Sequence, residues 1–152
     1  AFLMALGMAI GAFVAGWMVP WFGSSKRVAI VGNLGTAAAF LGLGLIPGLG
    51  APGAVALQVL AGLFGMCYGV ILSHARLFFP EHLLGRGVTF ANFLSIGGAG
   101  LVLSGSGYFM RGALADGISP TAAFSMLHVS FAAMLLTALV FYVRSPAGPE
   151  KR

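Results

Sequence analysis

The chain has 152 residues, of which 59% are hydrophobic and only 7% are charged, and its mean hydropathy is +1.01. A soluble domain carries about 25% charged residues, so these residues cannot supply a water-facing surface, and a soluble globular protein is excluded. The net charge of +5 comes from eight Lys and Arg residues against three Asp and Glu. In a polytopic membrane protein such an excess marks the cytoplasmic loops, so it does not indicate nucleic-acid binding.

Five segments contain no Asp, Glu, Lys or Arg, and each is predicted to span the membrane: residues 1–22, 28–47, 54–75, 88–110 and 121–143. A helix of about 20 residues crosses a hydrocarbon core of about 30 Å. Barrel strands would instead alternate polar and apolar residues over about ten positions. We therefore predict an all-α bundle of about five spans, forming a single domain over residues 1–152 with a tail at 144–152.

The connectors alternate in charge along the chain. Seven of the eight basic residues fall in the segments 23–27, 76–87 and 144–152, which must share one side of the membrane, and Arg111 alone falls on the other. The positive-inside rule then places the C-terminus in the cytoplasm. We expect a protein of the bacterial-type inner membrane. The first residues are already apolar and lack a basic start, so we expect a fragment of a longer polytopic chain without a signal peptide.

Small and polar residues suggest which helix faces pack against other helices or line a cavity. Glycine pairs four residues apart predict close helix packing, or alternatively the lining of a pathway: Gly7 and Gly11, Gly44 and Gly48, and Gly65 and Gly69. Two stripes are predicted, each on a single helical face. The first holds Gln58, Gly62, Gly65, Gly69, Ser73 and Arg76, and the second holds Asn92, Ser95, Ala99 and Ser106. Each stripe fits either interhelical hydrogen bonding or a cavity lining.

No catalytic site, metal site or cofactor is predicted, and we do not expect an enzyme. Ser104 and Ser106 show a weak similarity to rhomboid-type proteases, but the glycine required two residues before the nucleophile is Val102 or Ser104 here. His74, Glu81 and His82 have no regular spacing and are interpreted as a solvated loop at the membrane edge. A phosphate-binding loop motif does not occur in the sequence.

With this topology, the chain resembles the carboxy-terminal end of a major facilitator superfamily transporter, its five spans matching the eighth to twelfth of twelve. Gly16, Gly23, Lys26 and Arg27 resemble the family's conserved loop, although Pro20 stands where that loop has Asp. The segments Phe78–Pro80 and Gly85–Gly87 resemble the loop between the tenth and eleventh helices.

The resemblance implies alternating access around a central cavity. It implies cavity positions at Gln58, Gly62, Gly65, Tyr68, Ser73, Asn92 and Ser95. It implies gating positions in cytoplasmic loops at Gly23, Lys26, Arg27, Pro80, Gly85 and Arg86. The expected partners are the lipid bilayer, the missing N-terminal helices and a small solute, with no nucleic acid. A structural subunit of a membrane complex and a membrane-embedded enzyme remain as alternatives.

Overall fold

The computed structural model describes residues 2–46 and 48–146, and in that part of the chain the regular secondary structure is entirely helical. The elements are α1 (Phe2–Phe22), α2 (Ser25–Leu45), α3 (Ala51–Gly65), α4 (Tyr68–Arg76), the 3-10 helix η1 (Glu81–Leu83), α5 (Leu84–Ala115) and α6 (Pro120–Arg144). Five segments are long and apolar enough to cross a membrane: Phe2–Phe22, Ser25–Leu45, Ala51–Arg76, Glu81–Ala115 and Pro120–Arg144. The all-helical fold with five candidate spans is therefore confirmed.

Glycine, serine and proline set the helix boundaries. Gly23, Gly48 and Gly117 have φ angles of 62°, 70° and 79°, in the left-handed region that only glycine adopts readily, and they form the turns between spans. At the start of α6, the Ser119 hydroxyl accepts a hydrogen bond from the Ala122 amide at 3.3 Å, and Pro120 follows in the first turn. Both features favour a helix start at this point.

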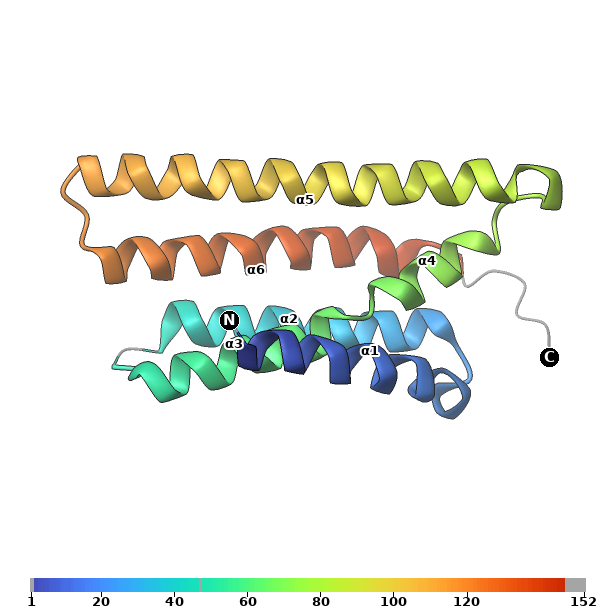
Figure 1. Ribbon diagram of the computed structural model, residues 1–152, viewed down its shortest axis with the longest axis horizontal. Helices are drawn as coiled ribbons and strands as arrows, with labels where there is room; N and C mark the ends of the chain where they lie inside the picture. The colour runs from blue at the N-terminus through green and yellow to red at the C-terminus, as the bar shows by residue number, and fades with distance from the viewer. Residues whose placement is uncertain (1, 47, 147–152) are drawn as a thin grey trace.

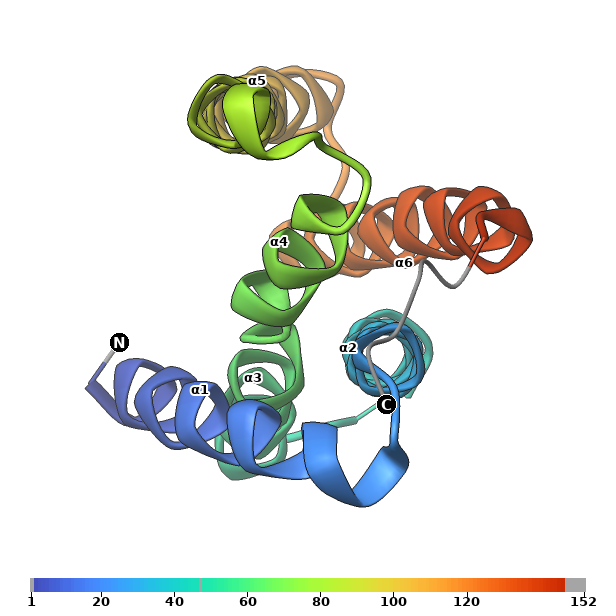
Figure 2. The same cartoon turned by 90° about the vertical axis from the view of Figure 1, so that its right-hand side faces the viewer.

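The helix α2 is the centre of the bundle. It packs most extensively against α6 and also against α3, which in turn packs against α1 (Figures 1 and 2). The close approaches occur at glycines. A Cβ on Gly44 would lie 2.9 Å from the carbonyl oxygen of Ser125 on α6, and a Cβ on Gly7 would lie 2.8 Å from that of Val59 on α3. Close packing through small residues is how helices associate in lipid.

In contrast, α5 stands apart from the first three helices. It lies on the far side of α6 and α4 in both views, and most of its side chains are exposed (Figures 1 and 2). Its glycines from Gly97 to Gly112 have no heavy atom within 4 Å of the position that a Cβ would take. The glycine content of α5 therefore does not reflect close packing against the described helices.

Two spans differ from the predicted ones. The third is broken at Met66 and Cys67 into α3 and α4, and the fourth begins at Leu84 and continues to Ala115. Arg111 consequently lies on a helix, where its guanidinium carbon is 4.8 Å from the centre of the Tyr108 ring, rather than in a connector. Long basic side chains at helix ends reach the interface while their stems stay apolar, so the charge does not end the helix. The predicted span ends at residues 1 and 47, and the tail from 147 to 152, lie outside the described residues.

The charges divide between the two ends of the bundle. The last turns of α4 and α6 and the first turns of α2 and α5 meet at one end (Figure 1). These turns carry Lys26, Arg27, Arg76, Arg86 and Arg144. We call this the basic end. The connectors between α2 and α3 and between α5 and α6 lie at the opposite end (Figure 1).

Candidate functional site

A break in the third span lies within the depth of the membrane. The helix α3 has 15 residues and α4 has nine, which correspond to about 22 Å and about 13 Å, so neither crosses a core of about 30 Å alone. Met66 and Cys67 between them are therefore surrounded by hydrocarbon or by protein. Non-helical backbone at this depth is tolerated only where it is buried in protein or lines a water-filled cavity.

One side of the break is buried against α2. The Cys67 side chain is only 3% exposed, and the Asn33 amide nitrogen donates a hydrogen bond to its sulfur at 3.4 Å. Gly32 makes room for this contact, because a Cβ there would lie 2.9 Å from both Cys67 Cβ and the Phe64 carbonyl oxygen. Thr36 lies one turn further along α2 and is also buried. The side of the break that carries Cys67 is thus packed against α2.

The other side of the break opens into a groove between α1 and α4. Its volume is about 470 Å³, and it is lined by Gly16 and Val19 of α1 and by Tyr68, Gly69 and Ser73 of α4, among others. The Tyr68 hydroxyl donates a hydrogen bond to Asn92 Oδ1 on α5. This bond links two helices at a depth where polar groups need partners.

The structure therefore brings together three of the residues that the sequence indicated as cavity positions. Tyr68 and Ser73 line the groove, and Asn92, which is not part of its lining, accepts the hydrogen bond from Tyr68. The Ser73 hydroxyl donates to the Gly69 carbonyl oxygen at 2.9 Å, and that of Ser95 donates to Ala91 on the same helix. Ser95 contributes no bond to another helix.

Three other predicted cavity positions, Gln58, Gly62 and Gly65, lie on α3, and none of them lines the groove. Gly62 packs against α1, where a Cβ would be 3.1 Å from Met4 O. Gly65 faces α2, where a Cβ on Gly65 would lie 3.7 Å from Thr36 Oγ1. Gln58 is half-buried on α3. Gly62 and Gly65 thus contact different helices within α3 itself, and the break at Met66 and Cys67 separates them from the three stripe residues on α4, which are Gly69, Ser73 and Arg76.

The residues predicted for gating gather at the basic end. Lys26 Nζ donates hydrogen bonds to the Val143 carbonyl oxygen, at 2.8 Å, and to that of Ser145. The last carbonyl groups of a helix have no partners within it and attract cations, so Lys26 ties the start of α2 to the end of α6. Gly23 forms the turn before α2, and Pro80 directly precedes η1. Arg27, Gly85 and Arg86 lie exposed in first helical turns rather than in loops.

His74 corrects the expectation of a solvated loop. It lies on α4 with 3% of its surface exposed, and its Nδ1 is 2.9 Å from the Tyr142 hydroxyl on α6. Its ring also contacts those of Phe78 and Tyr142 edge-on. The reason is that α4 continues to Arg76 and turns this face toward α6. The sequence indicates neither the burial of His74 nor its partner Tyr142, whereas Glu81 and His82 are exposed as expected.

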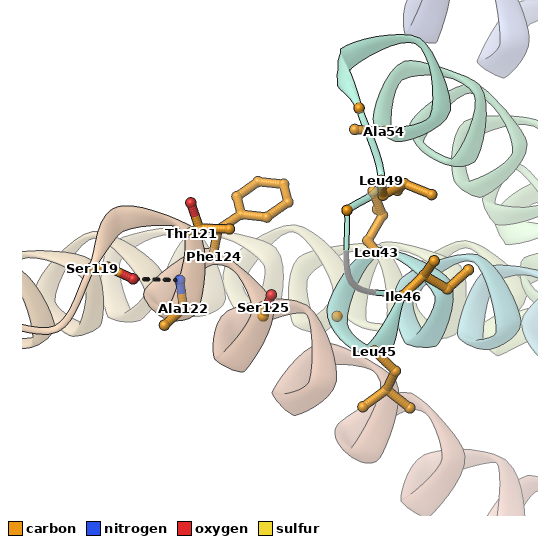
Figure 3. A pocket seen from close by; sticks show the side chains of 13 residues that line it. Leu43, Leu45, Ile46, Leu49, Ala54, Ser119, Thr121, Ala122, Phe124 and Ser125 are labelled. Carbon is orange, nitrogen blue, oxygen red and sulfur yellow. Dashed lines mark hydrogen bonds between the residues drawn. The ribbon is translucent and has the colours of Figure 1, made fainter.

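A wider hollow of about 770 Å³ lies at the opposite end, between the end of α2, the following connector and the start of α6 (Figure 3). Its lining is mostly apolar, including Leu43, Leu49 and Phe124, and carries no charged side chain. The Ser119 hydroxyl at its edge already caps α6 (Figure 3). This hollow contains none of the predicted cavity positions, although Gly44 and Gly48 of one predicted glycine pair line it.

The described residues include no group of three or more His, Cys, Asp or Glu side chains placed to hold a metal ion. No protein-family model, curated protein or solved structure matches the chain. Fold and composition together define the class: this is an integral membrane protein built from apolar α-helices.

Proposed function

We propose that this chain is part of a secondary transporter, similar to the major facilitator superfamily, that moves a small solute by alternating access. The observation that carries the proposal is the break at Met66 and Cys67, inside the membrane and beside a groove with polar side chains. Transporters typically form their binding sites near the bilayer midplane from discontinuous helices. A subunit with a purely structural role has no comparable need for a broken span.

A binding site of this kind needs one side that is fixed in the bundle and one side that is open to water or a solute, and the two sides of the break fit these requirements. Asn33 and Gly32 hold the back of the break against α2, which keeps the site fixed in the bundle. Gly69 on the open side has no heavy atom within 4 Å of a Cβ position, so that side is free to face water or a solute. The remainder of the transporter would supply the second wall of the cavity.

The break also gives α4 a means to move relative to α3. The helix α4 is connected to α5 by the Tyr68–Asn92 hydrogen bond and to α6 by the contact between His74 and Tyr142. Both bonds join α4 to helices other than α3, so tilting at Met66 and Cys67 would change the opening at the basic end. We propose that the protein lies in a bacterial-type inner membrane and that the basic end, with its five described basic residues, faces the cytoplasm.

Cysteine accessibility tests the proposal in the complete protein. With Cys67 replaced by Ala, Gly69→Cys should react with a membrane-impermeant thiol reagent added to either face of reconstituted vesicles, because the groove opens to each side in turn. Thr137→Cys, on the exposed surface of α6, is the control and should react from neither face. Reaction of Gly69→Cys from one face only, or from neither, would contradict alternating access.

A further inference from the structure

The outer side of α5 at the basic end carries one arginine and two phenylalanines. Arg86, Phe90 and Phe93 are spaced four and three residues apart, so they lie on one side of the helix. Val102 and Ser106, which line a space that α5 shares with α6, lie on roughly the opposite side. The two phenylalanines are 59% and 69% exposed, and Arg86 is also exposed. This side of α5 therefore points away from the described helices, at the edge of the bundle (Figure 2).

A hollow of about 480 Å³ lies on this side, lined by Gly85, Arg86, Thr89, Phe90 and Phe93. Its polar and apolar parts differ in depth. Phe90 and Phe93 lie about 6 Å and about 10 Å further along the helix than Arg86, toward the middle of the span. Arg86, in the first turn of α5, is thus at the level of the lipid head groups, and the two phenylalanines are at the level of the acyl chains.

The guanidinium group of Arg86 presents a planar fork of N–H donors, and within the described part of the chain it has no hydrogen-bond or ion-pair partner. The Thr89 hydroxyl donates to the Gly85 carbonyl oxygen at 2.9 Å, so Arg86 supplies the free side-chain donors of the hollow. The five described basic residues of the basic end face one described acidic residue at this end, Glu81, so the surroundings are positive. A fork of donors matches the oxygens of a phosphate group, and basic residues at a membrane surface attract anionic lipids.

We infer that this hollow binds an anionic phospholipid, with its phosphate group on Arg86 and one acyl chain against Phe90 and Phe93. A second protein helix fits this surface less well. Helices associate in lipid through small residues, as α1 and α3 do at Gly7, whereas this side of α5 presents two large aromatic side chains. The inference goes beyond the proposed transport function and does not depend on it.

Native mass spectrometry of the complete protein in detergent tests the inference with two phospholipids that have the same acyl chains. Dioleoyl phosphatidylglycerol is anionic, whereas the choline cation of dioleoyl phosphatidylcholine cancels its phosphate charge and meets the positive basic end. We expect the anionic lipid to bind about tenfold more tightly. Glycerol 3-phosphate, which has the phosphate group without the acyl chains, should bind far more weakly than either lipid. Equal affinity for the two phospholipids, or equally tight binding of glycerol 3-phosphate, would overturn the inference.

Substitutions place the lipid on the hollow. Arg86→Gln should weaken binding of the anionic lipid by about tenfold, the loss expected for hydrogen bonds to a charged group. Arg86→Lys keeps the charge without the planar fork and should lose less. Arg27→Gln is the matched control, because it removes the same charge from an exposed position at the same end, and it should change the affinity by no more than about twofold. Phe93→Ala should weaken both phospholipids alike, because it removes apolar surface that their common acyl chains contact.

Two patterns among the variants would contradict the site. A loss in Arg27→Gln as large as that in Arg86→Gln would show general attraction to the basic end instead of a site on α5. Unchanged affinity in both Arg86 variants, or in Phe93→Ala, would place the lipid elsewhere on the protein.

Discussion

Gly11 lies where α1 crosses α3, and a Cβ at this position would overlap the carbonyl group of Leu63. Gly16, five residues later on the same helix, has no heavy atom within 4 Å of a Cβ position. The predicted pairing of Gly7 with Gly11 as a packing contact is confirmed. The same spacing at Gly65 and Gly69 has a different meaning, because these two residues lie on either side of the helix break and neither is in close contact.

These two glycines of α1 give a matched prediction. Gly11→Ala should lower the free energy of unfolding by about 1–3 kcal/mol, as overpacking a close contact does. Gly16→Ala should leave it unchanged or raise it slightly, because Ala is the better helix former. Thermal unfolding of the detergent-solubilised protein measures both effects. Equal melting temperatures for the two variants would show that α1 does not approach α3 as closely as the structure places it.

At the scale of the helices, Lys26 joins the start of α2 to the end of α6 through two carbonyl oxygens. We expect Lys26→Met to destabilise the bundle by about 0.5–1 kcal/mol, the value of a half-exposed cation at a helix C-terminus. The exposed neighbour Arg27 provides the control, since Arg27→Met removes the same charge without removing these bonds. The difference between the variants should shrink in 1 M salt, which screens the interaction. A difference that persists there would contradict the electrostatic explanation.

Hydropathy alone predicted the spans, because lipid requires long uninterrupted apolar helices and the chain supplies five of them. It could not predict the break in the third span, since Gly65, Met66 and Cys67 carry neither a proline nor a charge. At the break, Cys67 contacts Gly32 and Asn33 of another helix, and the local sequence does not report such contacts.

The sequence also does not predict how each helix is rotated about its own axis relative to its neighbours. The sequence indicated Tyr68 and Asn92 as separate cavity positions on neighbouring spans, and their hydrogen bond follows only from how α4 and α5 face each other. The burial of His74 against Tyr142 has the same origin, because 68 residues separate the two along the chain. Local patterns carry no information about such distant pairs.

For the molecule as a whole, the proposed orientation has the basic end in the cytoplasm. His82 on η1 is exposed at this end, and Asp116 is exposed at the other. In a Cys67→Ala background, His82→Cys should be protected from an impermeant thiol reagent in intact cells, whereas Asp116→Cys should react. Asp116 is a better reporter than the adjacent Gly117, whose φ of 79° makes any side chain there strained. The opposite labelling pattern would reverse the topology.

The extensive packing of α2 against α6 has a consequence for biosynthesis. Lys26 and Val143 are 117 residues apart, and a ribosome adds about 5–20 residues per second, so α2 enters the membrane on the order of ten seconds before its main partner exists. During that interval the face of α2 that carries Phe40 and Gly44, which contacts α6 in the finished bundle, lacks its partner. A nascent chain stalled before α6 would therefore present this face to the insertion machinery and to membrane proteases, and completion of the last helix is the step that removes it from their reach.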